Sequence, residues 1–183
     1  MSRLTLSHKF LILAAAAWVG AAVIALAYGT SLASASTSVA PLRLIWPETD
    51  SVISQVFGPS RQVIEPAYGS YAHFHTGIDF AAPVGSPVLA AAAGQVVVIG
   101  QEKRGAVEKG YGDYVIVAHA GRWATLYAHL LNTPLVHLGE TLLQGQRVGL
   151  EGTTGNSTGP HLHFELRLDG AAVDPAPYLN PSP

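Results

Sequence analysis

The chain has 183 residues, of which 49% are hydrophobic and 12% are charged, and its formal net charge is −2. This length and this hydrophobic content suffice for one well-packed domain. The nearly neutral charge offers no basic surface for nucleic acid and no acidic tail, so no nucleic-acid partner is expected. The chain has no cysteine, which excludes disulfides and thiolate metal sites and leaves His, Asp and Glu as the available metal ligands.

The first 35 residues have the features of an export segment. Arg3 and Lys9 precede an uncharged apolar run over residues 10–29, FLILAAAAWVGAAVIALAYG, which is long enough to span a membrane. Residues 33–35, Ala-Ser-Ala, give the small-x-small pattern at which signal peptides are cut. We therefore expect residues 1–35 to be either a cleaved signal peptide or an N-terminal membrane helix. Both alternatives deliver the rest of the chain outside the cytoplasm and confine membrane contact to this segment.

A short linker is expected between this segment and the folded domain. Residues 30–41, TSLASASTSVAP, are small and polar and show no hydrophobic periodicity. With the export segment ending at residue 35, the linker covers residues 36–41 and the domain covers residues 42–183.

The domain is expected to be mainly β. Short runs rich in Val, Ile and aromatic residues alternate with glycine-containing turns, and no long amphipathic helix is visible. The alanine run before Gly94 could be helical, but Gly94 and the β-branched triplet at 96–98 favour two strands. The expected strands cover residues 88–92, 95–100, 114–119, 124–129, 147–150 and 161–168.

Two histidines one residue apart stand in the last of these strands, within GNSTGPHLHFEL at residues 155–166. Because side chains alternate along a strand, His161 and His163 project to one face. The other face carries Leu162, Phe164 and Leu166, which indicates that it is the core face. Two imidazoles about 6.5 Å apart on one face can converge on one metal ion. On its own, the pattern is also compatible with a solvated strand face.

A second cluster, HFHTGIDF at residues 73–80, contains His75 and Asp79. Gly77 and the following AAPVGSP argue against a helix, so we expect a loop that enters a strand. Histidine and aspartate are common zinc ligands, and a catalytic zinc takes three protein ligands and keeps an open position for water. His75, Asp79 and one or both histidines of the His-Leu-His pair meet this number.

A third motif, TLYAHL, places His129 at the end of a strand, on the same face as Tyr127. A zinc hydrolase needs one group that takes a proton from water and another that stabilises the tetrahedral oxyanion. No His-Glu-x-x-His helix is present to supply a glutamate base, so histidine would have to perform these tasks. Glu165 follows the His-Leu-His pair on its face and is either a partner that orients an imidazole or an ordinary exposed carboxylate. The histidines expected to be structural or on the surface are His73, His119 and His137.

At these residues the sequence resembles the lysostaphin-type (LytM-domain) zinc metallopeptidases, which cut peptide bonds in peptidoglycan. The resemblance runs from residue 56 to residue 166, through VFGPSR, HTGIDFAAPVGSPVLAAAAGQVV, GYGDYVIVAH, TLYAHL and GTTGNSTGPHLHFEL. It implies an antiparallel sheet domain of the duplicated hybrid motif type, with zinc on the face of the sheet. Loops would form the walls of a groove that is open to an extended peptide.

By similarity, His75, Asp79 and His163 are the zinc ligands, and His129 and His161 are the catalytic pair. The implied function is that of a zinc-dependent endopeptidase that acts on peptidoglycan stem peptides or cross-links in wall remodelling or lysis. The sequence distinguishes neither the cross-link nor which of the two catalytic histidines is the base. The alternative function is a non-catalytic domain that binds the wall or activates an amidase. Spacing alone also permits a metal site in which His161 is a ligand and Asp79 an outer partner.

Overall fold

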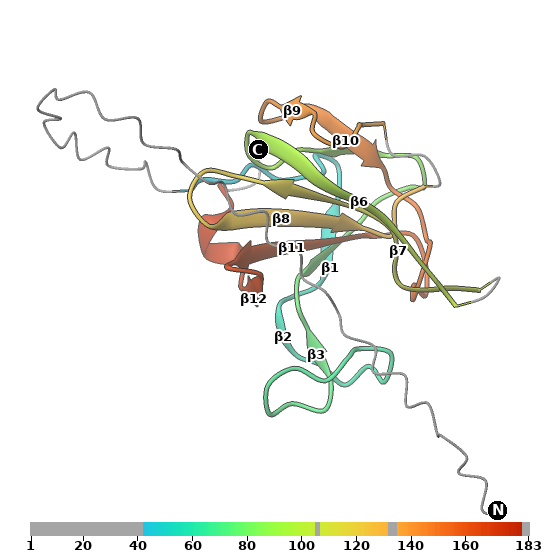
Figure 1. The fold of residues 1–183 in the computed structure, drawn as a ribbon. Coiled ribbons are helices and arrows are strands. Elements are labelled where there is room, and N and C mark those ends of the chain that lie inside the picture. Colours follow the sequence, from blue (N-terminus) through green and yellow to red (C-terminus); the bar gives the residue numbers. More distant parts are fainter. Residues whose placement is uncertain (1–41, 105–106, 132–134, 181–183) are drawn as a thin grey trace, which may run out of the picture. The chain divides into compact units, whose positions relative to one another are not determined.

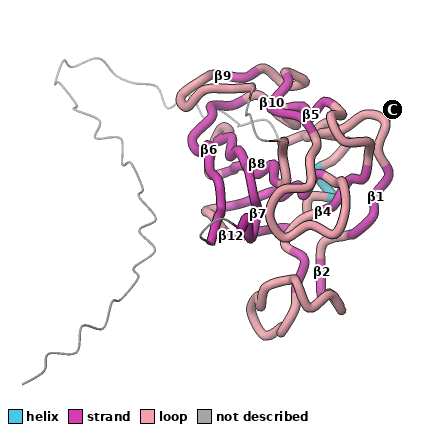
Figure 2. The backbone as a smooth tube through the Cα atoms, turned by 90° about the vertical axis from the view of Figure 1, so that its right-hand side faces the viewer, coloured by secondary structure: helices cyan, strands magenta, loops and turns pink. Residues whose placement is uncertain are grey.

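A computed structural model describes residues 42–104, 107–131 and 135–180 (Figure 1). The expected export segment and linker lie outside these residues. Strands and loops make up nearly all of the described backbone (Figure 2), and within these ranges the one helical turn is η1 (Ala176–Tyr178). The described part of the chain contains no helix that is long and apolar enough to cross a membrane. The expected mainly β fold is thus confirmed for these residues.

The central element is an eight-stranded antiparallel sheet with the order β1-β4-β11-β8-β7-β6-β9, in which β12 also pairs with β11. Figure 1 shows β6, β7, β8 and β11 running side by side. The strands are β1 (Val52–Gln55), β4 (Ile78–Ala81), β6 (Gly94–Arg104), β7 (Val107–Ala118), β8 (Trp123–Ala128), β9 (Thr141–Leu142), β11 (Leu162–Leu168) and β12 (Ala171–Val173). Two small antiparallel pairs join β2 (Gly58–Pro59) to β3 (Phe74–His75) and β5 (Pro87–Leu89) to β10 (Arg147–Leu150).

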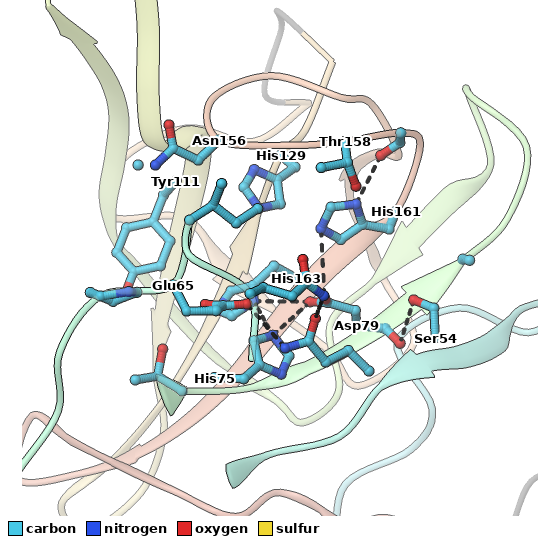
Figure 3. Close-up of a pocket in the computed structure, with 18 of the residues that line it drawn as sticks. Ser54, Glu65, His75, Asp79, Tyr111, His129, Asn156, Thr158, His161 and His163 are labelled. Carbon is cyan, nitrogen blue, oxygen red and sulfur yellow. Dashed lines mark hydrogen bonds and ion pairs between the residues drawn. The ribbon is translucent and has the colours of Figure 1, made fainter. Parts of the chain in front are cut away.

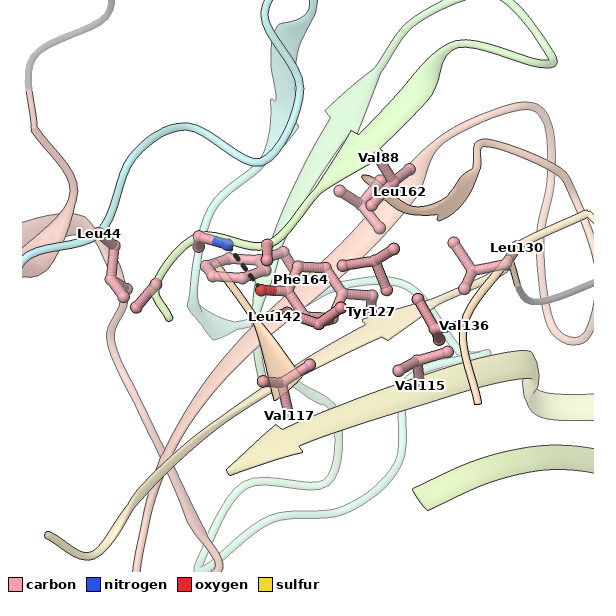
Figure 4. Packing of buried hydrophobic residues seen from close by; sticks show 14 of the residues in the cluster. Leu44, Val88, Val115, Val117, Tyr127, Leu130, Val136, Leu142, Leu162 and Phe164 are labelled. Atoms are coloured by element: carbon pink, nitrogen blue, oxygen red, sulfur yellow. Dashed lines mark hydrogen bonds between the residues drawn. The ribbon is translucent and has the colours of Figure 1, made fainter. Parts of the chain in front are cut away.

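One face of the sheet packs into the hydrophobic core (Figure 4). Phe164 of β11 lies opposite Tyr127 of β8, and Leu162 of β11 lies opposite Phe80 of β4. All four side chains are fully buried. The hydroxyl of Tyr127 accepts a hydrogen bond from the backbone N–H of Ala91 at 2.8 Å, so its polar atom is satisfied inside the core. The expected core face of β11 is therefore confirmed, and its other face is free for polar side chains.

The expected strands lie in the right places but differ in length. Residues 147–150 form β10 as predicted, whereas residues 95–100 and 114–118 of two other predicted strands are parts of the longer hairpin β6-β7, and residue 119 lies just outside it. His129 and His161 lie just outside β8 and β11. The predicted strand at 88–92 ends at Leu89, because the next two N–H groups donate to Gln146 and to the Tyr127 hydroxyl rather than to a strand partner.

Glu48 and Glu151 form a buried pair of carboxyl groups beside the end of β10. Their exposed fractions are 1% and 0%, and neither carboxyl oxygen of Glu48 has a hydrogen-bond partner among the described residues. Glu151 accepts hydrogen bonds from the backbone N–H of Ala82 at 3.0 and 3.3 Å. Burial, and then the contact with Glu151, raise the pKa of Glu48 to about 9. Glu48 therefore keeps its proton at neutral pH, which avoids two negative charges in this buried pair.

Replacing Glu48 with Gln should make the fold less sensitive to alkaline pH. The pKa of Glu48 rises from 4.5 to about 9 on folding. The stability that its proton contributes to the fold is therefore fully present below pH 4.5 and is lost as the pH rises through about 9. We expect the melting temperature of the unaltered protein to fall by on the order of 5 °C or more between about pH 6 and about pH 9, and that of Glu48→Gln to fall less. Circular dichroism measures both. Asp50→Asn removes an exposed neighbouring carboxyl and should behave like the unaltered protein; equal falls in all three would contradict the role of the Glu48 proton.

Candidate metal centre

Three side chains from neighbouring strands converge in the structure (Figure 3). His75 ends β3, Asp79 lies in β4, and His163 lies in β11, where the strand register pairs it directly with Asp79. Nε2 of His75 lies 2.9 Å from Oδ1 of Asp79 and 3.0 Å from Nδ1 of His163. Nδ1 of His163 in turn lies 3.0 Å from Oδ1 of Asp79. All three residues are buried. Together they form a group of ligand atoms that could hold one metal ion.

Gly77 lets the chain bring His75 and Asp79 to one point. Between β3 and β4 the backbone passes close to β11, and a Cβ atom at Gly77 would lie 2.3 Å from the carbonyl oxygen of Phe164 and 3.1 Å from Cε1 of His163. Both distances are shorter than van der Waals contacts, so any side chain here would push the turn away from β11. The glycine in HTGIDF is thus a condition for the convergence of the cluster.

Hydrogen bonds orient the ring nitrogens of both histidines. Nδ1 of His75 donates to the carbonyl oxygen of Val56 at 3.0 Å, so Nε2 carries the lone pair. Nε2 of His163 donates to Oε1 of Glu165 at 3.1 Å, which turns Nδ1 toward Asp79. Donor atoms at about 2.0–2.1 Å from a tetrahedral zinc are about 3.3 Å apart. The separations in the cluster are close to this value, and the donor set of two imidazoles and one carboxylate is one that zinc accepts.

The electrostatics of the cluster favour a cation. Burial opposes the ionisation of Asp79, but hydrogen bonds with His163 and His75 outweigh it and hold the pKa of this carboxyl well below its usual range. Burial also opposes a charge on His163, but its hydrogen bonds to Asp79 and Glu165 raise its pKa to about 9. Two buried carboxylates therefore stabilise positive charge on either side of this ring. A metal ion bound at Nδ1 would replace the proton that Asp79 holds there.

His129 and His161 lie beside this cluster. Their ring centroids are 4.7 Å apart, and Nε2 of His161 lies 3.8 Å from Oδ2 of Asp79. Nδ1 of His129 donates to the carbonyl oxygen of Thr154 at 2.7 Å, and Nδ1 of His161 donates to that of Gly159 at 2.8 Å. Nε2 of each ring is then the nitrogen available to a substrate. Burial, and then the neighbouring histidines, lower the pKa of His129 to about 3, so its ring is neutral at neutral pH.

The prediction that His129 shares a face with Tyr127 is wrong. Tyr127 lies in the core, whereas the next residue, Ala128, pairs with His163 on the polar face. Continued alternation would put His129 on the core side. His129 instead follows the end of β8 with a φ of 60°, in the left-handed region, and this breaks the alternation and turns the ring toward the cluster. The hydrogen bond to Thr154 holds the ring there.

Two glycines in contact hold the loop that precedes His161. Gly112 and Gly155 have φ angles of 60° and 75°, and a Cβ atom on Gly155 would lie 2.3 Å from the backbone nitrogen of Gly112. Thr154 adds a hydrogen bond in which its Oγ1 accepts from the backbone N–H of Asp113 at 3.0 Å. The loop therefore lies against β7, and this contact explains the need for glycine in GTTGNSTG.

The five predicted site residues line one open groove with a volume of about 560 Å³. Residues 62 and 64–66, in the loop between β2 and β3, contribute to one wall, and residues 156 and 158–160, in the loop before β11, contribute to another. The other histidines lie elsewhere: His119 is buried and bonds to Ala93 and Thr125, His137 is exposed, and His73 bonds to the backbone of Glu65. The sequence analysis thus separated the groove histidines from the rest of the described ones.

Three polar residues of the site were missed. Thr76 and Tyr111 line the groove, and both donate to the buried carboxylate of Glu165, at 2.6 and 2.7 Å. Arg167 donates to the same carboxylate at 2.7 Å. The only signals in the sequence were the glycines that flank Tyr111 and the position of Arg167 on the same strand face as His163. Neither signal points to a site on its own.

Comparisons with known proteins agree with this geometry. The sequence profile described as Peptidase family M23 matches residues 73–175, which is more than half of the chain. The peptidoglycan DD-endopeptidase ShyA of Vibrio cholerae is 41% identical over 100 residues, which cover 55% of this chain and 22% of ShyA. The chain spans about a quarter of the length of this and other curated relatives, among them a metalloprotease of Haemophilus influenzae at 24%.

Solved structures show the same fold. A zinc-containing peptidase from Vibrio cholerae superposes with a TM-score of 0.60 at 34% identity, covering 73% of this chain and 39% of that one. The catalytic domain of lysostaphin from Staphylococcus simulans superposes with a TM-score of 0.57 at 29% identity, covering 70% of this chain and 91% of that one. The resemblance to lysostaphin-type enzymes is confirmed, and the chain belongs to peptidase family M23.

Proposed function

We propose that the protein is a zinc-dependent endopeptidase that hydrolyses peptide bonds in peptidoglycan. The observation that carries the proposal is the convergence of His75, Asp79 and His163 in an open groove, beside two histidines whose Nε2 atoms remain available. The relatives support the substrate class, since ShyA is named a peptidoglycan DD-endopeptidase and lysostaphin an antimicrobial peptidase. Among peptidoglycan bonds, we propose a D,D cross-link as the target.

His75, Asp79 and His163 would hold the zinc ion. When bound, zinc supplies Lewis acidity, which polarises the scissile carbonyl and makes water a better nucleophile. The neutral ring of His129 accepts a proton from the attacking water at Nε2. His161 serves the oxyanion or the leaving amine, and the Asp79 carboxylate, 3.8 Å from its Nε2, complements the positive charge that the ring carries when it donates.

The proposed substrate also requires that the domain act outside the cytoplasm. The basic start and the apolar run at residues 10–29 support this location, as does the place of peptidoglycan itself. We propose that residues 1–35 are either a signal peptide or a membrane anchor, and that the enzyme domain begins near residue 42.

The full-length protein, loaded with zinc, should convert D,D-linked muropeptide dimers to monomers in purified peptidoglycan. Mass spectrometry of the released fragments identifies the bond, because hydrolysis adds one water and leaves one new amine and one new carboxyl group. Casein, which has no D-amino acids, should stay intact. Zinc-loaded protein that binds peptidoglycan and releases no fragment would contradict the proposal and favour the non-catalytic alternative.

Single alanine variants should separate metal binding from chemistry. His75→Ala, Asp79→Ala and His163→Ala should lose zinc and activity together, because two remaining ligands hold the ion less tightly. His129→Ala and His161→Ala should keep zinc and lose activity by a factor on the order of 100 or more. Zinc content by atomic emission and the muropeptide assay provide the two readouts.

His137→Ala changes an exposed histidine outside the groove and is the matched control, with zinc and activity unchanged. Loss of zinc in His161→Ala with retention in Asp79→Ala would overturn the ligand assignment.

A reporter enzyme fused after Pro183 should be active only outside the cytoplasm. N-terminal sequencing of the mature chain then distinguishes the two alternatives: a chain that starts at Ser36 indicates a cleaved signal, and an intact N-terminus indicates an anchor. An active reporter inside the cytoplasm would rule out both.

A further inference from the structure

Glu165 lies at the centre of a buried polar network beside the metal cluster. Its side chain is fully buried. Oε1 accepts three hydrogen bonds, from Thr76 at 2.6 Å, from the Tyr111 hydroxyl at 2.7 Å and from Nε2 of His163 at 3.1 Å. Oε2 accepts one, from Nε of Arg167 at 2.7 Å, and no second donor in the described part of the chain reaches it. Arg167 is therefore the residue that fixes Oε2, while the other three donors fix Oε1.

Arg167 continues the row that His163 and Glu165 begin along β11. These residues alternate with the core residues of the strand, so their side chains share the polar face. Nη2 of Arg167 also donates to the Tyr111 hydroxyl at 3.1 Å, and Cζ lies 5.8 Å from the centre of that ring. The planar guanidinium thus fixes the Glu165 carboxylate and the Tyr111 phenol relative to each other, which a lysine ammonium, with no rigid fork, does less well.

The position of Glu165 matters because this carboxylate holds His163. Without Arg167, Oε1 would keep three donors and Oε2 would have none. A buried carboxylate oxygen without a partner is costly, and rotation of the carboxylate toward water or another donor would relieve that cost. The same rotation would move Oε1 away from Nε2 of His163 and release the ring whose Nδ1 faces Asp79.

We propose that Arg167 is a positioning residue of the metal centre, acting through Glu165 to hold His163 in the orientation that binds zinc. This inference rests on the proposed zinc-dependent function. Partners of metal-bound histidines typically contribute a factor of about 10–100 to metal affinity. Arg167 contacts Glu165 and not His163 itself, so its contribution to metal affinity depends on how firmly it fixes the Glu165 carboxylate.

The test is the zinc dissociation constant of the full-length protein, measured by competition with a chelator. Arg167→Gln should raise this constant by about 10-fold or more, and Arg167→Lys, which keeps the charge without the fork, by a smaller factor. Arg122→Gln is the matched control, because it breaks the exposed ion pair between Arg122 and Asp169 (2.6 Å) outside the groove. It should leave zinc affinity unchanged.

A second comparison tests the route through Glu165. In a Glu165→Gln background, Arg167→Gln should weaken zinc binding little further, whereas additive losses would overturn the proposed route.

The melting temperature without metal reports any purely structural effect. A lower melting temperature with unchanged zinc affinity in Arg167→Gln would overturn the inference. If Arg167→Gln does not fold, Arg167→Lys carries the test, and unchanged affinity there would count against the role of the fork. Failure of the unaltered protein to bind zinc would instead contradict the proposed function itself.

Discussion

The pairing of β4 with β11 is the constraint on which the site depends. In this register Asp79 lies opposite His163 on the polar face, while Phe80 lies opposite Leu162 in the core. Because side chains alternate, a slip of one residue would turn the ligands into the core and the core residues toward the groove. Burial of the apolar pair therefore holds the metal ligands in place, and Gly77 permits the close approach that this register requires.

Charge balance explains why the polar face of β11 carries the residues that it does. Asp79 and Glu165 are buried carboxylates, and each needs a positive partner to offset the loss of hydration. Arg167 supplies one for Glu165 from the outer side of the row. His163 lies between the two carboxylates and bonds to both, so it holds either a second proton or a metal ion. A cation at the cluster thus offsets the negative carboxylate charge that remains after Arg167 has paired with Glu165.

The parts predictable from sequence were those that follow local rules. Period-2 alternation placed the histidines of HLH on one face. The resemblance to lysostaphin-type enzymes, not spacing, supplied the full set of five residues that converge. Tertiary contacts decided the rest. The left-handed turn of His129 depends on a carbonyl of Thr154, far along the chain, so alternation misplaced it relative to Tyr127. The strands β1 and β4, of four residues each, are too short for a periodic signal, and the pair of Glu48 and Glu151 forms only in the folded state.

The most direct measurement of the central claim is the position of the metal. Crystals grown with zinc and measured at the zinc absorption edge should show one anomalous peak bonded to Nε2 of His75, Oδ1 of Asp79 and Nδ1 of His163, at about 2.0–2.2 Å from each. His129 and His161 should border the open side of the ion without binding it. A peak bonded to His161 in place of Asp79, or a fully folded site without a peak in excess zinc, would contradict this account.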